Sequence, residues 1–363
     1  MILTTALVAA LAFFETEPLD PALDWHDCSE PTALEGRGFP GEAYPFHRIP
    51  ERHHTNCTDK VWGLSKTSIG FAARFVTDSD VLVVRWEFPG YHGPMTQESM
   101  LAHAGIDVYA RRPGENRWRH VGFKSPDWRV AKNDRKSRHV FAGEYELKWR
   151  PGDEALVYLP PRVGPNNFAI GLKKGASYKK GRPHIAAKPV VHYGTSIVNG
   201  GQISRPGMVL TSLIGRLADV EVVNLGFSGS GCMEPPMADM IGDIDAALYV
   251  IDCEHNMGYE TVDKNYEAFL RRLVAKRPDT PVLMVGGSNP ADTPSGTEKR
   301  ALAILEKLKK EDPAKWAKYS HLSGVELLPN TDDCRIDQVH PNDHGFMYMA
   351  PVYADRIRKI LAK

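Results

Sequence analysis

Pro189-Val190-Val191-His192-Tyr193-Gly194-Thr195-Ser196 is the stretch that decides the fold of this chain. An apolar run ends in a glycine and a serine, and a glycine pair, Gly200-Gly201, follows before a helix expected from about Pro206. This order predicts a strand, a turn and a helix, with Ser196 on the turn. Ligands of parallel α/β sheets bind outside the carboxyl ends of the strands, so Ser196 is a candidate reactive residue. Such junctions are common and mostly structural, so this assignment depends on the rest of the chain.

After about residue 185, short apolar runs alternate with segments in which apolar residues recur at helical spacing. Strands are expected at 190–193, 221–224, 247–251, 282–285 and, from a weaker pattern, 325–328. Helical spacing predicts helices over 209–217, 266–274, 302–308 and 346–360, and Pro351 is expected to start a turn or a kink in the last one. Continuous apolar strands between amphipathic helices indicate a parallel sheet covered on both faces. We therefore expect a three-layer α/β/α, flavodoxin-like domain over residues 186–363.

The first half of the chain has an apolar period of two. Alternation predicts antiparallel strands, with no helix among them, over 69–75, 82–88, 106–109, 118–121, 145–149, 156–158 and 168–170. Short strands at this spacing indicate a jelly-roll-like β-sandwich over residues 18–185. Its aromatic residues either fill the core or stack on a sugar ring, the candidates being Trp86, Trp118, Trp128 and Trp149. The basic run 124–138 is either a solvated loop or a contact for an acidic polysaccharide.

The 363-residue chain has the composition of an ordinary globular protein and is long enough for two domains. Its 45 lysines and arginines balance its 45 aspartates and glutamates, so the net charge does not attract nucleic acid or anionic lipid. We expect neither a nucleic-acid partner nor stable membrane insertion, and the oligomeric state is left open.

Residues 1–14 are apolar apart from two threonines and resemble the hydrophobic part of a secretory signal. The run is too short for a membrane span and lacks a basic start, so a start-site artefact or a buried strand is the alternative. We expect residues 1–17 to be a signal peptide and the protein to be secreted or periplasmic. The five cysteines leave two alternatives, a Cys28–Cys57 bridge in an exported chain or five reduced thiols.

Polar segments follow the predicted strands of the second half. Ser196 follows the first strand, the glycine-rich run 226–231 follows the second, 252–256 follows the third, and 337–343 comes after the fifth. Because the carboxyl ends of parallel strands share one edge of a sheet, these segments are expected to meet there.

These residue types fit nucleophilic catalysis by a serine. A serine hydroxyl is a poor nucleophile at neutral pH unless a base removes its proton and a carboxylate orients that base. Asp337 and His340 supply both, if the carboxylate accepts a bond from Nδ1 and Nε2 faces Ser196. The backbone N–H groups of Ser196 and Gly229 and the side-chain amide of Asn256 are candidate donors to the oxyanion. This chemistry requires no cofactor and no metal.

In order and spacing, the four segments resemble the blocks of the SGNH (GDSL-type) hydrolase superfamily. The resemblance covers residues 189–363 and implies that Ser196 is the nucleophile, that Gly229 and Asn256 are oxyanion donors, and that His340 is the base. Asp337 stands before it in the superfamily's Asp-x-x-His-Pro element.

The upstream half resembles the β-sandwich that precedes the hydrolase domain in one esterase subgroup, whose hallmark is Gly-x-Asp-Leu-Tyr. The matching segments are Val61–Ser65, Phe75–Ser79 and Gly105–Tyr109. Members of this subgroup are mostly bacterial exported proteins, many of which deacylate carbohydrates, so the resemblance implies an acylated carbohydrate as the substrate.

The chain departs from the superfamily pattern at two places. Thr195 replaces the usual aspartate before the nucleophile, and Glu254-His255-Asn256-Met257 replaces the usual Gly-x-Asn-Asp. His255 is expected either to form a hydrogen bond within the protein or to contact substrate. Arg205, in the loop after the nucleophile, either binds an acidic group of the substrate or faces solvent.

The sequence therefore predicts a serine esterase that removes O-acetyl groups from a polysaccharide or oligosaccharide. The first alternative is a lipid or thioester acylhydrolase of the same superfamily, which would carry an exposed apolar groove at the catalytic edge; no unusually apolar loop is evident there. The second is a non-catalytic carbohydrate-binding protein in which the aromatic residues of the sandwich recognise the ligand.

Overall fold

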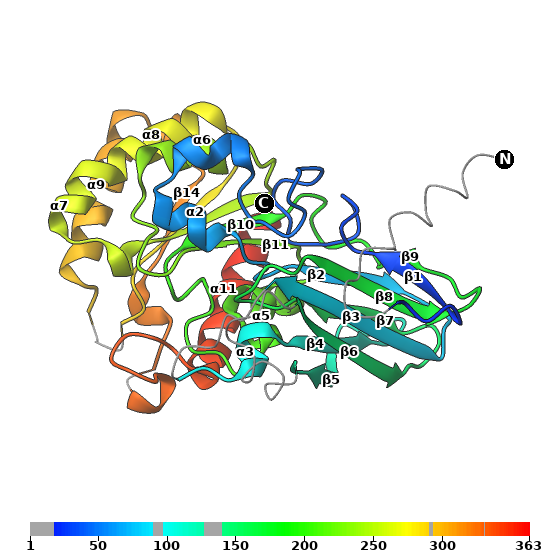
Figure 1. Ribbon diagram of the computed structural model, residues 1–363. Coiled ribbons are helices and arrows are strands. Elements are labelled where there is room, and N and C mark those ends of the chain that lie inside the picture. Colours follow the sequence, from blue (N-terminus) through cyan, green and yellow to red (C-terminus); the bar gives the residue numbers. More distant parts are fainter. Residues whose placement is uncertain (1–17, 90–96, 127–139, 290–292, 330) are drawn as a thin grey trace. The chain divides into compact units, whose positions relative to one another are not determined.

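The computed structural model describes residues 18–89, 97–126, 140–289, 293–329 and 331–363 (Figure 1). The chain forms two compact units. Unit 1 contains the chain up to His47 together with Lys66–Arg182 and Ser204–Gly207, and unit 2 contains Arg48–Ser65, Pro183–Ile203 and Met208–Lys363. Residues 48–65 thus pack with unit 2, although they lie inside the range expected for the sandwich.

Unit 1 is a sandwich of two antiparallel sheets, which confirms the predicted architecture. One sheet has the order β1-β8-β3-β6 and the other the order β5-β4-β7-β2-β9. The strands are β1 (Leu23–Asp27), β2 (Ala72–Val76), β3 (Val81–Pro89), β4 (Ile106–Arg111), β5 (Arg119–Lys124), β6 (Val140–Lys148), β7 (Glu154–Tyr158), β8 (Asn167–Lys173) and β9 (Lys179–Lys180). Alternate residues point to opposite faces of each strand, so the period of two observed in the sequence places one apolar set between the sheets.

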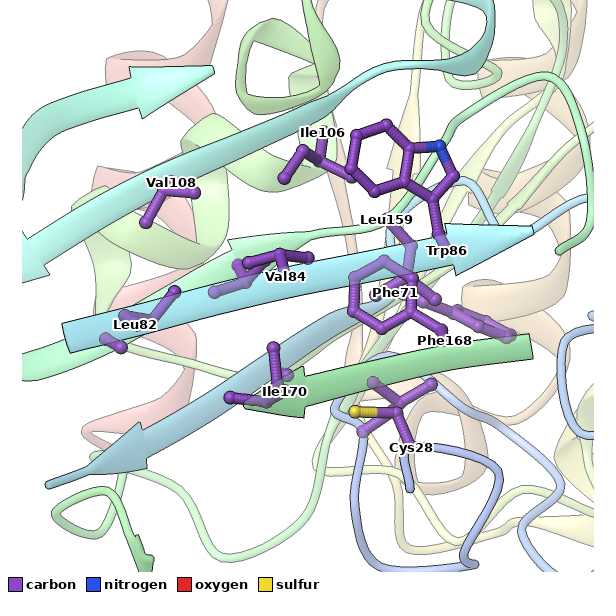
Figure 2. Packing of buried hydrophobic residues seen from close by; sticks show 14 of the residues in the cluster. Cys28, Phe71, Leu82, Val84, Trp86, Ile106, Val108, Leu159, Phe168 and Ile170 are labelled. Atoms are coloured by element: carbon purple, nitrogen blue, oxygen red, sulfur yellow. The ribbon is translucent and has the colours of Figure 1, made fainter. Parts of the chain in front are cut away.

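Large aromatic and branched side chains fill the space between the two sheets (Figure 2). Trp86 on β3 is fully buried there, and its Nε1–H donates to the carbonyl of Ala104 at 3.1 Å. Trp149 is also buried, so both residues are core and neither is available to stack on a sugar. Trp118 is half-buried beneath the guanidinium of Arg111, 4.4 Å from the ring centre. Trp128 and most of the basic run lie outside the described residues.

Unit 2 is built on a parallel five-stranded sheet with the order β11-β10-β12-β13-β14, the order expected for a flavodoxin-like fold. The strands are β10 (Val190–Gly194), β11 (Val222–Gly226), β12 (Leu248–Asp252), β13 (Val282–Val285) and β14 (Tyr319–Leu322). The helices are α2 (Asp59–Ser65), α5 (Leu210–Ala218), α6 (Pro235–Ile241), α7 (Tyr259–Thr261), α8 (Glu267–Lys276), α9 (Gly296–Glu311), α10 (Pro313–Trp316) and α11 (Asp343–Leu361). Helices α5 and α11 lie side by side on one face, and α6, α8 and α9 cover the other (Figure 1).

The structure corrects several sequence-based boundaries. The fifth strand is Tyr319–Leu322 and not 325–328, because Ser323 and Glu326 form a capping box that starts a short 3-10 turn over Gly324–Glu326. Helix α6 was not predicted, nor were α2 and the short α3 (Met100–Ala104) in the strand-rich half. Helix α11 continues through Pro351 to Leu361, so no turn begins at this residue.

The cysteines follow the second of the two alternatives. All five are free thiols, so the Cys28–Cys57 bridge is not formed. Cys28 is part of the sandwich core, where burial raises the pKa of its thiol, whereas Cys57 belongs to the 48–65 segment of unit 2. Among the described helices, none combines the length and the apolar composition needed to cross a bilayer.

Candidate active site

The carboxyl ends of three neighbouring strands bring the predicted blocks together. Gly194 at the end of β10 is in register with Gly226 on β11 and with Asp252 on β12. The turns that follow are in close contact: a Cβ on Gly226 would lie 2.2 Å from the backbone nitrogen of Asn199. A glycine is therefore required at the end of β11 for the two turns to approach each other.

A chain of hydrogen bonds connects Ser196, His340 and Asp337. The Oγ of Ser196 lies 2.9 Å from Nε2 of His340, although 144 positions separate them in sequence. Nδ1 of the same imidazole lies 2.8 Å from Oδ2 of Asp337. The Asn342 side chain caps α11 by accepting the N–H of Gly345, which fixes the end of the loop that carries His340.

Backbone donors keep Asp337 ionised. Its Oδ1 accepts the N–H of Val339 at 2.8 Å and that of His340 at 2.6 Å. Partial burial opposes ionisation, but these bonds and the imidazole outweigh it and lower the pKa of Asp337 to about 2. An ionised carboxylate only accepts hydrogen bonds, so it holds the imidazole proton on Nδ1 and leaves Nε2 as the acceptor for the serine hydroxyl.

The glycine-rich turn after β11 has left-handed backbone at Gly229 (φ 60°) and Gly231 (φ 75°). A Cβ on Gly231 would lie 2.3 Å from the carbonyl oxygen of Gly194, so this turn packs directly on the end of β10. Lys60 of α2, which is exposed, donates from Nζ to the carbonyl of Gly229 at 2.9 Å. Ser228 of the same turn accepts a hydrogen bond from the side-chain amide of Asn199 at 3.0 Å.

The block after β12 is anchored to both sides of the site. The side-chain amide of Asn256 donates to the carbonyl of Ser230 in the glycine-rich turn. His255 forms a hydrogen bond of 2.9 Å with the hydroxyl of Ser288, and burial lowers the pKa of its imidazole. This is the protein-internal alternative considered for His255.

Glu254 accepts hydrogen bonds from the segment after β13, at the backbone of Gly287 and the hydroxyls of Ser295 and Thr297.

Arg205 is bonded within unit 1. Its Nη1 donates to Oδ2 of Asp107 at 2.8 Å and to the hydroxyl of Tyr109 at 2.5 Å, and the N–H of Gly207 donates to the same carboxylate oxygen at 2.9 Å. Asp107 and Tyr109 belong to the segment that resembles Gly-x-Asp-Leu-Tyr, so this motif holds the 204–207 loop. A contact between Arg205 and substrate stays a prediction.

Local sequence signals did not reveal two residues that bind the glycine-rich turn, Arg48 and Lys60, nor the bonds of Glu254 to the segment after β13. Arg48 and Lys60 lie more than a hundred residues before the blocks they contact, and no spacing rule connects them. Glu254 was noted only as a departure from the family pattern. Within the described part of the chain, no group of three histidine, cysteine or acidic side chains is arranged to hold a metal ion.

Comparison with known families agrees with this geometry. Residues 187–361 match the GDSL-like lipase/acylhydrolase family, and residues 23–178 match the GxDLY family, described as the N-terminus of SGNH-hydrolase-type esterases. The chain belongs to the SGNH (GDSL-like) hydrolase superfamily. The resemblance inferred from the sequence is thus confirmed, and the chain is an acylhydrolase of the esterase type by family. No curated protein sequence matches it.

Solved structures show the same two-part fold. A protein from Bacteroides ovatus described as a GDSL-like lipase has 27% identity and a TM-score of 0.78, covering 94% of this chain and 98% of its own. Salicylyl-acyltransferase SsfX3 from a tetracycline biosynthetic pathway has 20% identity and a TM-score of 0.63, covering 95% of each chain. A family two carbohydrate esterase from Clostridium thermocellum has 10% identity and a TM-score of 0.55, covering 80% of this chain and 92% of its own. At these last two identities the similarity concerns the fold alone.

Proposed function

We propose that this protein is a serine esterase that removes O-acetyl groups from a polysaccharide or oligosaccharide. The observation that carries the proposal is the continuous hydrogen-bonded chain from Ser196 through His340 to Asp337. Membership of an acylhydrolase superfamily supports the reaction class, and carbohydrate esterases with the same fold support the substrate class.

The residues act in this order. His340 Nε2 accepts the proton of the Ser196 hydroxyl as Oγ attacks the ester carbonyl carbon, and the ionised Asp337 stabilises the imidazolium that forms. The backbone N–H groups of Ser196 and Gly229 and the Asn256 amide donate to the oxyanion. The imidazolium of His340 then gives its proton to the departing sugar oxygen, which leaves as a hydroxyl, and the neutral imidazole takes a proton from the water that hydrolyses the acyl-enzyme.

A second candidate is hydrolysis of a longer acyl chain, as in a lipid ester or thioester. Four exposed apolar side chains lie beside the candidate base in sequence: Ile336 (52% exposed), Val339 (45%), Met347 (52%) and Tyr348 (48%). Ile336 also bonds His340 through the backbone, its N–H donating to the His340 carbonyl at 3.1 Å. Ile336 and Val339 thus flank the candidate base in its loop, and exposed apolar side chains at this place favour an apolar acyl group.

Turnover of Ser196→Ala tests the reaction. We expect a loss of several orders of magnitude in hydrolysis of p-nitrophenyl acetate and in acetate release from acetylated glycans, together with loss of fluorophosphonate labelling. Ser320→Ala is the control, since this hydroxyl lies on β14 and bonds only weakly to Val282 (3.4 Å). Full activity in Ser196→Ala would exclude the proposed nucleophile. Octanoate esters turned over much faster than acetate esters would favour the second candidate, and glycan binding without labelling would favour a binding protein.

A further inference from the structure

We infer that Arg48, which comes from outside the hydrolase sequence blocks, is a positioning residue for the two turns that carry the nucleophile and the oxyanion donor. The inference rests on the proposed function, because it concerns the presentation of Ser196 and Gly229 to a substrate. Arg48 is 2% exposed, so its guanidinium is held in the interior of unit 2.

The guanidinium of Arg48 binds the glycine-rich turn at its first residue. Nη1 donates to the carbonyl oxygen of Gly226 at 2.6 Å. It also lies 3.4 Å from the backbone oxygen and 3.4 Å from the side-chain oxygen of Asn224, two residues earlier on β11. The carbon of the guanidinium lies 4.7 Å from the ring centre of Phe227, the next residue of the turn. The planar, always-charged group thus fixes the direction in which the chain leaves β11.

The same guanidinium reaches the nucleophile turn. Nη2 lies 3.4 Å from Oδ1 of Asn199, and the amide of Asn199 donates to the Ser228 hydroxyl at 3.0 Å. The backbone N–H of Asn199 donates to the carbonyl of Thr195, directly before the nucleophile, at 2.9 Å. Arg48 and Asn199 therefore connect the turn that carries Ser196 to the glycine-rich turn that begins at Gly226.

Hydrogen bonds within the 48–65 segment hold both the backbone and the side chain of Arg48 in place. Its backbone N–H donates to the carbonyl of Ser65 at 2.8 Å, and its Nη2 donates to the carbonyl of Leu64 at 2.7 Å, so the two ends of the 48–65 segment are bonded together. The segment is also attached to the α6 region, where His53 Nε2 lies 2.9 Å from Asp243. A side chain held at several points loses little additional entropy when it holds a turn.

Loss of Arg48 is therefore expected to loosen two turns that must be aligned at the same moment. Oxyanion donors act only when they are fixed where charge develops, so a looser turn lowers kcat and leaves substrate binding nearly unchanged. A residue that merely supported the fold would lower the melting temperature without this division between kcat and KM.

The test compares Arg48→Gln, Arg48→Lys and Arg111→Gln in the full chain. Arg111 is the matched control, a 1% exposed arginine of the sandwich whose guanidinium binds Glu154. For Arg48→Gln we expect about a 10- to 100-fold lower kcat with less than a threefold change in KM, a smaller loss than the about 10²- to 10³-fold for removing an oxyanion donor itself. Arg48→Lys keeps the charge but has a single ammonium group in place of the two guanidinium nitrogens that bind the carbonyls of Gly226 and Leu64. We therefore expect a smaller loss in kcat, of about 10-fold.

Hydrogen exchange of peptides covering 194–201 and 226–231 provides a readout that does not depend on turnover. Exchange should become faster in both segments in the Arg48 variants and stay unchanged in Arg111→Gln. Unchanged exchange and kcat in Arg48→Gln, or equal losses in the Arg48 and Arg111 variants, would overturn the inference. Arg48→Lys decides the question if Arg48→Gln does not fold. If the wild-type protein hydrolyses no ester, the proposed function fails, whereas the exchange result still tests the role of Arg48.

Discussion

Replacement of Asp337 by asparagine is the sharpest test of the candidate triad. Two backbone N–H groups, of Val339 and His340, point at Oδ1, and the Nδ1–H of His340 points at Oδ2. An asparagine has one oxygen for three donors. Its oxygen is expected to face the two backbone groups, because the opposite orientation would place its NH₂ against both of them.

The amide NH₂ of the variant then faces Nδ1 of His340 and favours the imidazole tautomer with its proton on Nε2. This nitrogen lies 2.9 Å from the Ser196 hydroxyl and would no longer accept its proton. The expected loss in kcat is about 10³- to 10⁴-fold, which is about 4–5.5 kcal/mol of transition-state free energy, by analogy with the same change in a serine protease. KM is expected to change little because Asp337 does not bind the substrate.

Steady-state hydrolysis of p-nitrophenyl acetate measures this loss, with thermal unfolding by circular dichroism to show that the variant is folded. Asp355→Asn is the control, since it removes the charge of a carboxylate on α11 that pairs with Lys359 at 2.6 Å. A kcat within a factor of ten of the wild-type value in a folded Asp337→Asn would refute the tautomer argument, and with it the assignment of Asp337.

Two further predictions concern the oxyanion donor and pH. Asn256→Ala should lower kcat about 10²- to 10³-fold with little change in KM, as for the loss of one oxyanion donor, and a change confined to KM in steady-state assays would assign Asn256 to substrate binding instead. The folded-state pKa of Asp337, about 2, is below its ordinary value of 3.8, so its carboxylate stabilises the folded state above about pH 4 and loses this effect as pH falls toward 2. Urea unfolding should therefore show wild type and Asp337→Asn converging in stability between pH 5 and pH 2, and a constant difference would contradict the lowered pKa.

The mutual arrangement of Ser196, His340 and Asp337 was the part of the site that sequence reasoning addressed most directly. Asp337 and His340 are three residues apart, so a local loop brings their side chains together. Ser196 meets them because β10 ends at the sheet edge where the loop before α11 returns, and the flavodoxin-like order makes that edge common to all blocks. Their catalytic roles stay predictions.

The sequence by itself determined the two architectures and the position of the catalytic blocks, because apolar periodicity and short motifs are local properties of the chain. Only the tertiary structure decided where residues 48–65 belong, since their attachment to unit 2 depends on contacts such as Arg48 with Gly226, 178 positions apart. The same holds for Arg205, whose partners Asp107 and Tyr109 lie about a hundred residues away. Hydrogen bonds between distant segments follow from the packing of whole units, and no local pattern of residues encodes them.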